Sequence, residues 1–307
     1  MVALKKAWHW LDFIFPERQI FAHKLPLWQN LLVFAGLTGV FTLVGSFLPA
    51  NGFIGFDWVN FFSIQRIASF HPPWTIFAVA PLTWPLLVGL TLASVSVAVF
   101  LRSNHPISAA VTLLCLPVLW TVFLGQLEGL VVLGLLGLPW LAPLALIKPQ
   151  ISFFAFGARR SYLIALLLVI GFSIAVWGPW PLRMFSVESY YAEGRYPQNI
   201  ALGLWGLPIT LATVWFSRGD MDMLMLSGSF ATPHLIPYNL LPLTPALARL
   251  RPRAAIIGFF FSWLPLSANY IGPMGWWLGW FFVAWLWINL AAQRYPHARC
   301  STWINKL

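Results

Sequence analysis

Long runs of hydrophobic residues fill most of this chain, and short polar stretches separate them. A membrane-spanning helix needs about 20 mostly apolar residues. By this criterion the pattern predicts about ten spanning or half-spanning helices. They cover residues 28–48, 81–101, 107–124, 129–147, 161–177, 201–217, 221–232, 235–248, 254–271 and 275–292. The predicted fold class is therefore an all-α polytopic membrane protein.

Two of these stretches, 221–232 and 235–248, are too short to cross a bilayer alone as α-helices. The sequence Thr232-Pro233-His234 separates them, so we expect half-helices or a tilted pair that is broken at this proline. No linker or repeat divides the chain, which is predicted to be one polytopic domain over residues 1–307. Within it, residues 1–26 are expected on the cytoplasmic membrane surface. Residues 49–80 and 178–200 form the two larger outer loops.

Composition agrees with a membrane protein, because 60% of the residues are hydrophobic and only 8% are charged, against roughly 25% charged in soluble domains. Most basic residues follow an even number of predicted spans. They are Lys5, Lys6, Arg18, Lys24, Arg102, Lys148, Arg159, Arg160, Arg218, Arg249, Arg251, Arg253, Arg294, Arg299 and Lys306. Since positive charge marks cytoplasmic loops, both termini are expected in the cytoplasm of a multi-pass cell-membrane protein. This rule explains the net charge of +10 without a nucleic-acid partner.

The same topology places Lys148 on the cytoplasmic side, too far from the outer face to touch an outer phosphate, unless the stretch 129–147 is re-entrant. The two cysteines cannot pair, because Cys115 lies within a predicted span and Cys300 in the cytoplasmic tail. Neither histidines nor cysteines show a metal-binding spacing, and no glycine-rich phosphate loop is present. The sequence therefore predicts no metal and no cofactor, and it argues against a nucleotide-sugar donor.

The outer loops and turns carry the polar residues that topology does not explain. A helix in the outer membrane interface is expected near residues 53–70, ended by Pro72-Pro73. The candidate residues are Asp57, Arg66 and His71 in the first loop, Gln126 and Glu128 in a turn, Arg183, Glu188, Glu193 and Arg195 in the second loop, and His234 at the helix break. Such a gathering of carboxylates, arginines and aromatic residues on one side suggests an extracytoplasmic site.

Five short segments follow one another along the chain in a recognisable order. They are DWVNFF at 57–62 with HPPW at 71–74, LGQLEGL at 124–130, LIKPQ at 146–150, NIALGLWG at 199–206 and TPHLIPYNL at 232–240. This order resembles that of family-87-type integral membrane glycosyltransferases of the GT-C superfamily. The chain departs from that family in short spacers after Asp57 and Gly125. It also has Glu128 where Asn or Asp is commoner and Asn239 where Asp is commoner.

The resemblance implies a GT-C-like fold and transfer of a mannose-like hexose or a pentose. The donor would be a polyprenyl-phosphate sugar, and the acceptor an extracytoplasmic glycan, lipid or protein. Inverting transfer needs a base for the acceptor hydroxyl, and Asp57 is the best-placed carboxylate. The residues expected to bind substrate or the donor phosphate are Arg66, His71, Gln126, Glu128, Arg183, Arg195, His234 and Tyr238.

Structural interpretations of these residues stay open. Asp57 suits pairing with Arg66 or capping a short helix, Arg183 suits snorkelling to the interface, and Arg195 suits pairing with a nearby glutamate. At the level of function, two alternatives remain. One is a non-catalytic subunit of a membrane complex that keeps a GT-C-like fold, which the small size and short spacers favour. The other is a transporter of lipid-linked sugars, which the lack of repeats and of charge in mid-membrane disfavours.

Overall fold

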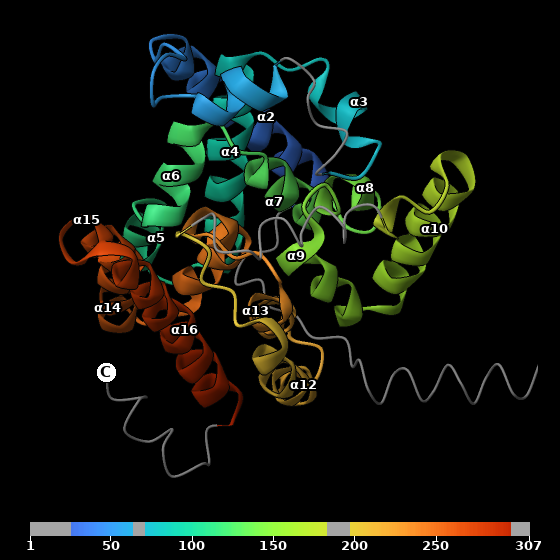
Figure 1. Ribbon diagram of the computed structural model, residues 1–307. Helices are drawn as coiled ribbons and strands as arrows, with labels where there is room; N and C mark the ends of the chain where they lie inside the picture. The colour runs from blue at the N-terminus through green and yellow to red at the C-terminus, as the bar shows by residue number, and fades with distance from the viewer. Residues whose placement is uncertain (1–25, 64–70, 183–196, 296–307) are drawn as a thin grey trace, which may run out of the picture.

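The computed structural model describes residues 26–63, 71–182 and 197–295, and within these ranges all regular structure is helical (Figure 1). Five segments among the described residues are long and apolar enough to cross a membrane. They are Trp28–Ser46, Trp84–Arg102, Pro106–Leu124, Arg160–Trp177 and Pro252–Arg294. The all-helical prediction is confirmed for the described residues, and membrane insertion is supported by these segments.

The first part of the chain packs a helical pair and places a short helical turn over one end of it. Helix α2 (Leu27–Ser46) lies along α4 (Trp84–Arg102), and between them in sequence come a π-helical turn η1 (Trp58–Phe62) and α3 (Thr75–Val79). The expected interfacial helix is thus short in its described part, since η1 ends at Phe62 and the rest of that stretch lies outside the described residues. The next apolar stretch is divided at Cys115 into α5 (Pro106–Leu113) and α6 (Leu116–Leu124).

The fourth predicted span, 129–147, is wrong as a single crossing, because this stretch folds into a hairpin. Helix α7 (Glu128–Leu136) is followed by a turn with a cis Leu138–Pro139 bond and by the short helix α8 (Ala142–Ala145). Proline lacks the backbone N–H and clashes within a helix, which explains why α7 does not continue. The two arms touch so closely that a Cβ at Gly134 would lie 2.1 Å from the backbone nitrogen of Ala145.

Beyond the hairpin, α9 (Pro149–Ser152) and η2 (Phe153–Ala158) connect to α10 (Arg160–Trp177). In Figure 1, α10 stands on one side of the molecule and the α14–α16 group on the other, with α7, α9 and α13 between them. The remaining elements are η3 (Gly203–Trp205), α12 (Gly206–Ser217), α13 (Met221–Ala231), η4 (Pro237–Arg249), α14 (Pro252–Trp263), η5 (Leu264–Ser267), α15 (Ala268–Ile271), η6 (Gly272–Leu278) and α16 (Gly279–Arg294).

The predicted break at Thr232-Pro233-His234 is confirmed, because α13 ends at Ala231 and η4 begins at Pro237. The second arm of this pair is a 3-10 helix of 13 residues. A 3-10 helix rises about 2.0 Å per residue instead of about 1.5 Å. The arm therefore reaches farther than an α-helix of the same length would.

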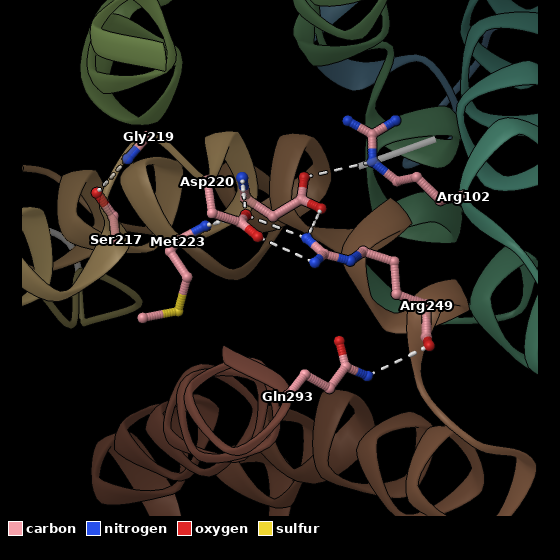
Figure 2. A network of polar contacts seen from close by, with 8 residues as sticks. Arg102, Ser217, Gly219, Asp220, Met223, Arg249 and Gln293 are labelled. Carbon is pink, nitrogen blue, oxygen red and sulfur yellow. Dashed lines mark hydrogen bonds and ion pairs between the residues drawn. The ribbon is translucent and has the colours of Figure 1, made fainter. Parts of the chain in front are cut away.

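A buried ion-pair network ties α4, α13 and η4 together at the end of this pair that lies away from the break (Figure 2). Asp222 is fully buried, and its carboxylate lies 3.3 Å from Arg102 Nε and 2.7 Å from Arg249 Nη1. Arg249 Nη2 also lies 3.0 Å from Asp220 Oδ2. Buried charges persist only when paired, so these four side chains form one structural unit. Sequence reasoning used the two arginines for topology alone and missed their acidic partners.

The close approach within the hairpin gives a direct test of this part of the fold. Gly134→Ala should lower the thermal unfolding temperature of the detergent-purified protein, because the new methyl group collides with backbone. The matched control is Gly171→Ala in α10, where a Cβ would meet nothing within 4 Å. That change should be neutral or stabilising by up to about 1 kcal/mol, since Ala favours helix over Gly. Equal stability of the two variants would contradict the hairpin.

Candidate functional site

Five polar side chains from separate parts of the chain form one continuous set of hydrogen bonds. Gln126 Nε2 donates to Asp57 Oδ2, and Lys148 Nζ donates to Gln126 Oε1. Lys148 Nζ also donates to Glu128 Oε1 at 2.7 Å, and Asn239 Nδ2 donates to the same oxygen at 2.8 Å. We call Asp57, Gln126, Lys148, Glu128 and Asn239 the polar cluster.

The backbone around Asp57 and Gln126 explains why these two side chains meet. Asp57 directly precedes η1, and Gln126 follows α6 after Gly125, whose φ of +76° suits glycine. A Cβ at Gly125 would lie 2.7 Å from Cβ of Trp58 and 2.8 Å from the Trp84 ring. The turn between α6 and α7 therefore packs directly against the residue that follows Asp57.

Lys148 lies beside Gln126 and Glu128, whereas the sequence topology predicts it on the opposite side of the membrane. The hairpin α7–α8 brings the chain back to its starting end, so Lys148 reaches Glu128 at the first residue of α7. Its ammonium group also lies 5.0 Å from the ring centroid of Tyr238, a cation–π distance. The prediction that Lys148 lies on the side opposite Gln126 and Glu128 is thus wrong.

The charge of Lys148 affects the pKa values of the two candidate histidines, His71 and His234. Burial, and to a smaller extent Lys148, lowers the pKa of His71 to about 3 and that of His234 to about 4. The His71 ring packs edge-on against Phe62 at a centroid distance of 5.7 Å. Both imidazoles are neutral at pH 7, so among the described residues of this site the cation is Lys148.

Asn199 brings the fourth of the five recognised segments to the fifth. Its side-chain oxygen accepts hydrogen bonds from the backbone nitrogens of Leu235, at 2.9 Å, and Ala201, at 3.2 Å. Its amide nitrogen donates to the carbonyl of Pro233 at 3.3 Å. Asn199 therefore holds the broken pair just before Tyr238 and Asn239, and all five segments belong to one hydrogen-bonded region.

Two carboxyl groups differ in their surroundings. Asp57 is half-buried, and burial raises its pKa above the ordinary range, against smaller opposing effects of Lys148 and Gln126. Glu128 is only 1% exposed, and its Oε2 has no hydrogen-bond partner among the described residues. A buried acceptor in this state favours a donor from a ligand or a water molecule.

The structure thus brings together Asp57, Gln126, Glu128 and Tyr238, with His71 and His234 nearby. Arg66, Arg183 and Arg195 lie outside the described residues, together with the glutamates proposed to pair with Arg195. In the described ranges, no group of three or more His, Cys, Asp or Glu side chains is arranged to hold a metal ion.

Sequence reasoning missed Lys148 and Asn239 as members of the site. The available signal for Lys148 was the set of helix breakers within 129–147, namely Gly129, Gly134, Gly137, Pro139 and Pro143. For Asn239, sequence alone contained no sign of the contact with Glu128, since 111 positions separate the two residues.

Comparisons with protein-family models, with curated proteins and with solved structures found no match to this chain.

The raised pKa of Asp57 predicts the sign of a stability change. The pKa of Asp57 in the folded protein lies above the unfolded value of about 3.9. As the pH rises from the unfolded pKa to the folded pKa, the carboxyl group therefore progressively destabilises the fold. Asp57→Asn should therefore be at least as stable as the wild type at pH 7, and the difference should vanish near pH 3, where both carry a neutral group. Thermal unfolding at several pH values measures this.

The matched control is Asp222→Asn, which removes a fully buried carboxylate that pairs with the buried Arg102 and the partly buried Arg249. It should destabilise the protein by about 3 kcal/mol at pH 7. If Asp57→Asn also destabilises the protein at pH 7, Asp57 is a structural ion partner and the argument from burial is wrong.

Proposed function

We propose that this chain is a polytopic membrane glycosyltransferase of GT-C-like fold that uses a polyprenyl-phosphate sugar as donor. The observation that carries the proposal is the convergence of the five segments that resemble family-87-type enzymes. They are spread from Asp57 to Leu240, yet side-chain hydrogen bonds join them into one region. Unrelated short matches would have no reason to meet in space.

In the proposed reaction, a hydroxyl group of the acceptor attacks the anomeric carbon of the donor sugar. Asp57 takes the hydroxyl proton, a new glycosidic C–O bond forms, and the bond from the anomeric carbon to the phosphate oxygen breaks. The electron pair leaves with the polyprenyl phosphate. A pKa raised by burial brings Asp57 closer to the proton affinity that a general base needs.

Lys148 supplies the charge that the leaving phosphate needs. An ammonium group at a largely buried position, with 10% of its side chain exposed, interacts with a phosphate more strongly than it would in water. Gln126 links this cation to Asp57, which places the phosphate side and the acceptor side of the reaction next to each other. The buried Oε2 of Glu128 is suited to accept a hydrogen bond from a sugar hydroxyl.

The proposal includes about ten transmembrane or half-membrane helices, with both termini in the cytoplasm and the polar cluster on the extracytoplasmic side. The hairpin α7–α8 returns the chain to the end of α7 at which Glu128 lies, and α9 with η2 then leads from Lys148 to Arg159 and Arg160.

A second candidate is a non-catalytic subunit of a membrane complex. It is favoured by one observation: the ammonium group of Lys148 already has two hydrogen-bond acceptors within the protein, Gln126 and Glu128. In a structural subunit these hydrogen bonds of Lys148 would serve stability alone.

Sugar transfer by the purified protein in lipid nanodiscs tests the proposal. The donor is radiolabelled polyprenyl-phosphate mannose, and extracted membrane glycolipids serve as acceptors. Asp57→Asn should reduce transfer by about 10²–10⁴-fold, as expected for loss of a general base. Asn51→Ala, at an exposed position of the same outer segment, should leave transfer unchanged.

Full transfer by Asp57→Asn would overturn the catalytic assignment. Absence of transfer by the wild type with each of several polyprenyl-phosphate sugars, mannose and pentose donors included, would favour the non-catalytic subunit.

A further inference from the structure

We infer that Glu128, itself held by Asn239, is a positioning residue that fixes the ammonium group of Lys148 for binding the donor phosphate. This inference rests on the proposed function, because it concerns the same site. It goes beyond it by assigning to Glu128 and Asn239 a role that acts through another residue.

The geometry at Glu128 Oε1 is the first step. This single oxygen accepts from Lys148 Nζ at 2.7 Å and from Asn239 Nδ2 at 2.8 Å. Lys148 has a long flexible side chain with three donors, so its position depends on its acceptors. Of the two acceptors, Glu128 alone carries a charge, and charge-assisted hydrogen bonds are the stronger kind.

The second step is the anchoring of Asn239. Its Oδ1 accepts from the backbone nitrogen of Ile236 at 2.8 Å, which caps the start of η4. With its oxygen fixed by backbone, the amide presents its Nδ2 donor to Glu128. Hydrogen bonds through Glu128 and Asn239 thereby fix the Lys148 ammonium group relative to the backbone at the start of η4.

The third step is the balance of charge. Glu128 is 1% exposed, and the Lys148 side chain is 10% exposed. Removal of the carboxylate would leave a largely buried cation whose other direct acceptor is the neutral amide of Gln126. Such a cation gains by moving toward water or toward Asp57, and either movement takes it from the position in which Glu128 holds it.

A double-mutant cycle tests this role with farnesyl phosphate as the probe, and its affinity is measured by titration calorimetry in nanodiscs. Lys148→Met and Glu128→Gln should each weaken binding by about tenfold, equivalent to about 1.4 kcal/mol. In the Lys148→Met background, Glu128→Gln should have no further effect, because Glu128 acts through Lys148. Asn239→Ala should weaken binding less than Glu128→Gln does.

Asp222→Asn is the matched control, since it also removes a buried, salt-bridged carboxylate but from the network between α4, α13 and η4. It should lower the unfolding temperature and leave the affinity for farnesyl phosphate unchanged. A general loss of stability therefore cannot imitate the expected result.

Three results would overturn the inference. They are an unchanged affinity in Glu128→Gln, an equal loss caused by Glu128→Gln with and without Lys148, and no saturable binding by the wild type. The proposed function fails separately, through full sugar transfer by Asp57→Asn. A non-additive cycle together with that result would leave Lys148 as a positioned phosphate-binding cation in a protein that is not a transferase of the proposed kind.

Discussion

The ion pair between Lys148 and Glu128 is the interaction on which the arrangement of the candidate site depends. Its 2.7 Å contact joins the two ends of the hairpin α7–α8. It also connects Asp57 and Gln126 on one side with Asn239 on the other. A buried cation and a buried carboxylate are each costly when alone, so the folded chain keeps them together and with them the four segments that carry Asp57, Gln126, Lys148 and Asn239. Asn199 joins the remaining segment to the one that carries Asn239.

The hairpin is the constraint that makes this pair possible. A straight helix from Glu128 to Lys148 would place the two side chains about 30 Å apart, at about 1.5 Å per residue. The turn at Gly137–Pro139 reverses the chain, and the glycine at position 134 lets the two arms approach to backbone contact. A second polar anchor, the network of Arg102, Asp220, Asp222 and Arg249, fixes the other end of α13 and η4 (Figure 2). The broken pair thus carries a polar anchor at each end.

Much of this architecture could be predicted from the pattern of apolar residues, and the exceptions have physical causes. The long helices α2, α4 and α10 match their predicted stretches closely, because about 20 apolar residues leave few other choices in a membrane. The break at Pro233 could also be predicted, because a proline separates two short apolar stretches there. The stretch 129–147 was wrongly predicted as one span, because hydropathy gives the length and apolarity of a segment and does not reveal where the segment reverses.

The polar contacts were harder to foresee, since they depend on how distant segments meet. Asp57 and Gln126 were singled out from their place between spans, but the bond between them depends on the close packing of Gly125 against Trp58. Similarly, Arg102 and Arg249 read as topology signals in sequence, and only the fold reveals that Asp222 pairs with both.

A cryo-electron microscopy structure of the nanodisc-embedded protein with a polyprenyl-phosphate sugar bound tests the central claim most directly. The account predicts that the phosphate lies within hydrogen-bond distance, about 3 Å, of Lys148 Nζ. It also predicts that the anomeric carbon faces Asp57 and that the lipid tail extends into the membrane. A donor phosphate bound away from Lys148, for instance beside Arg102 and Arg249 at the other anchor, would contradict it.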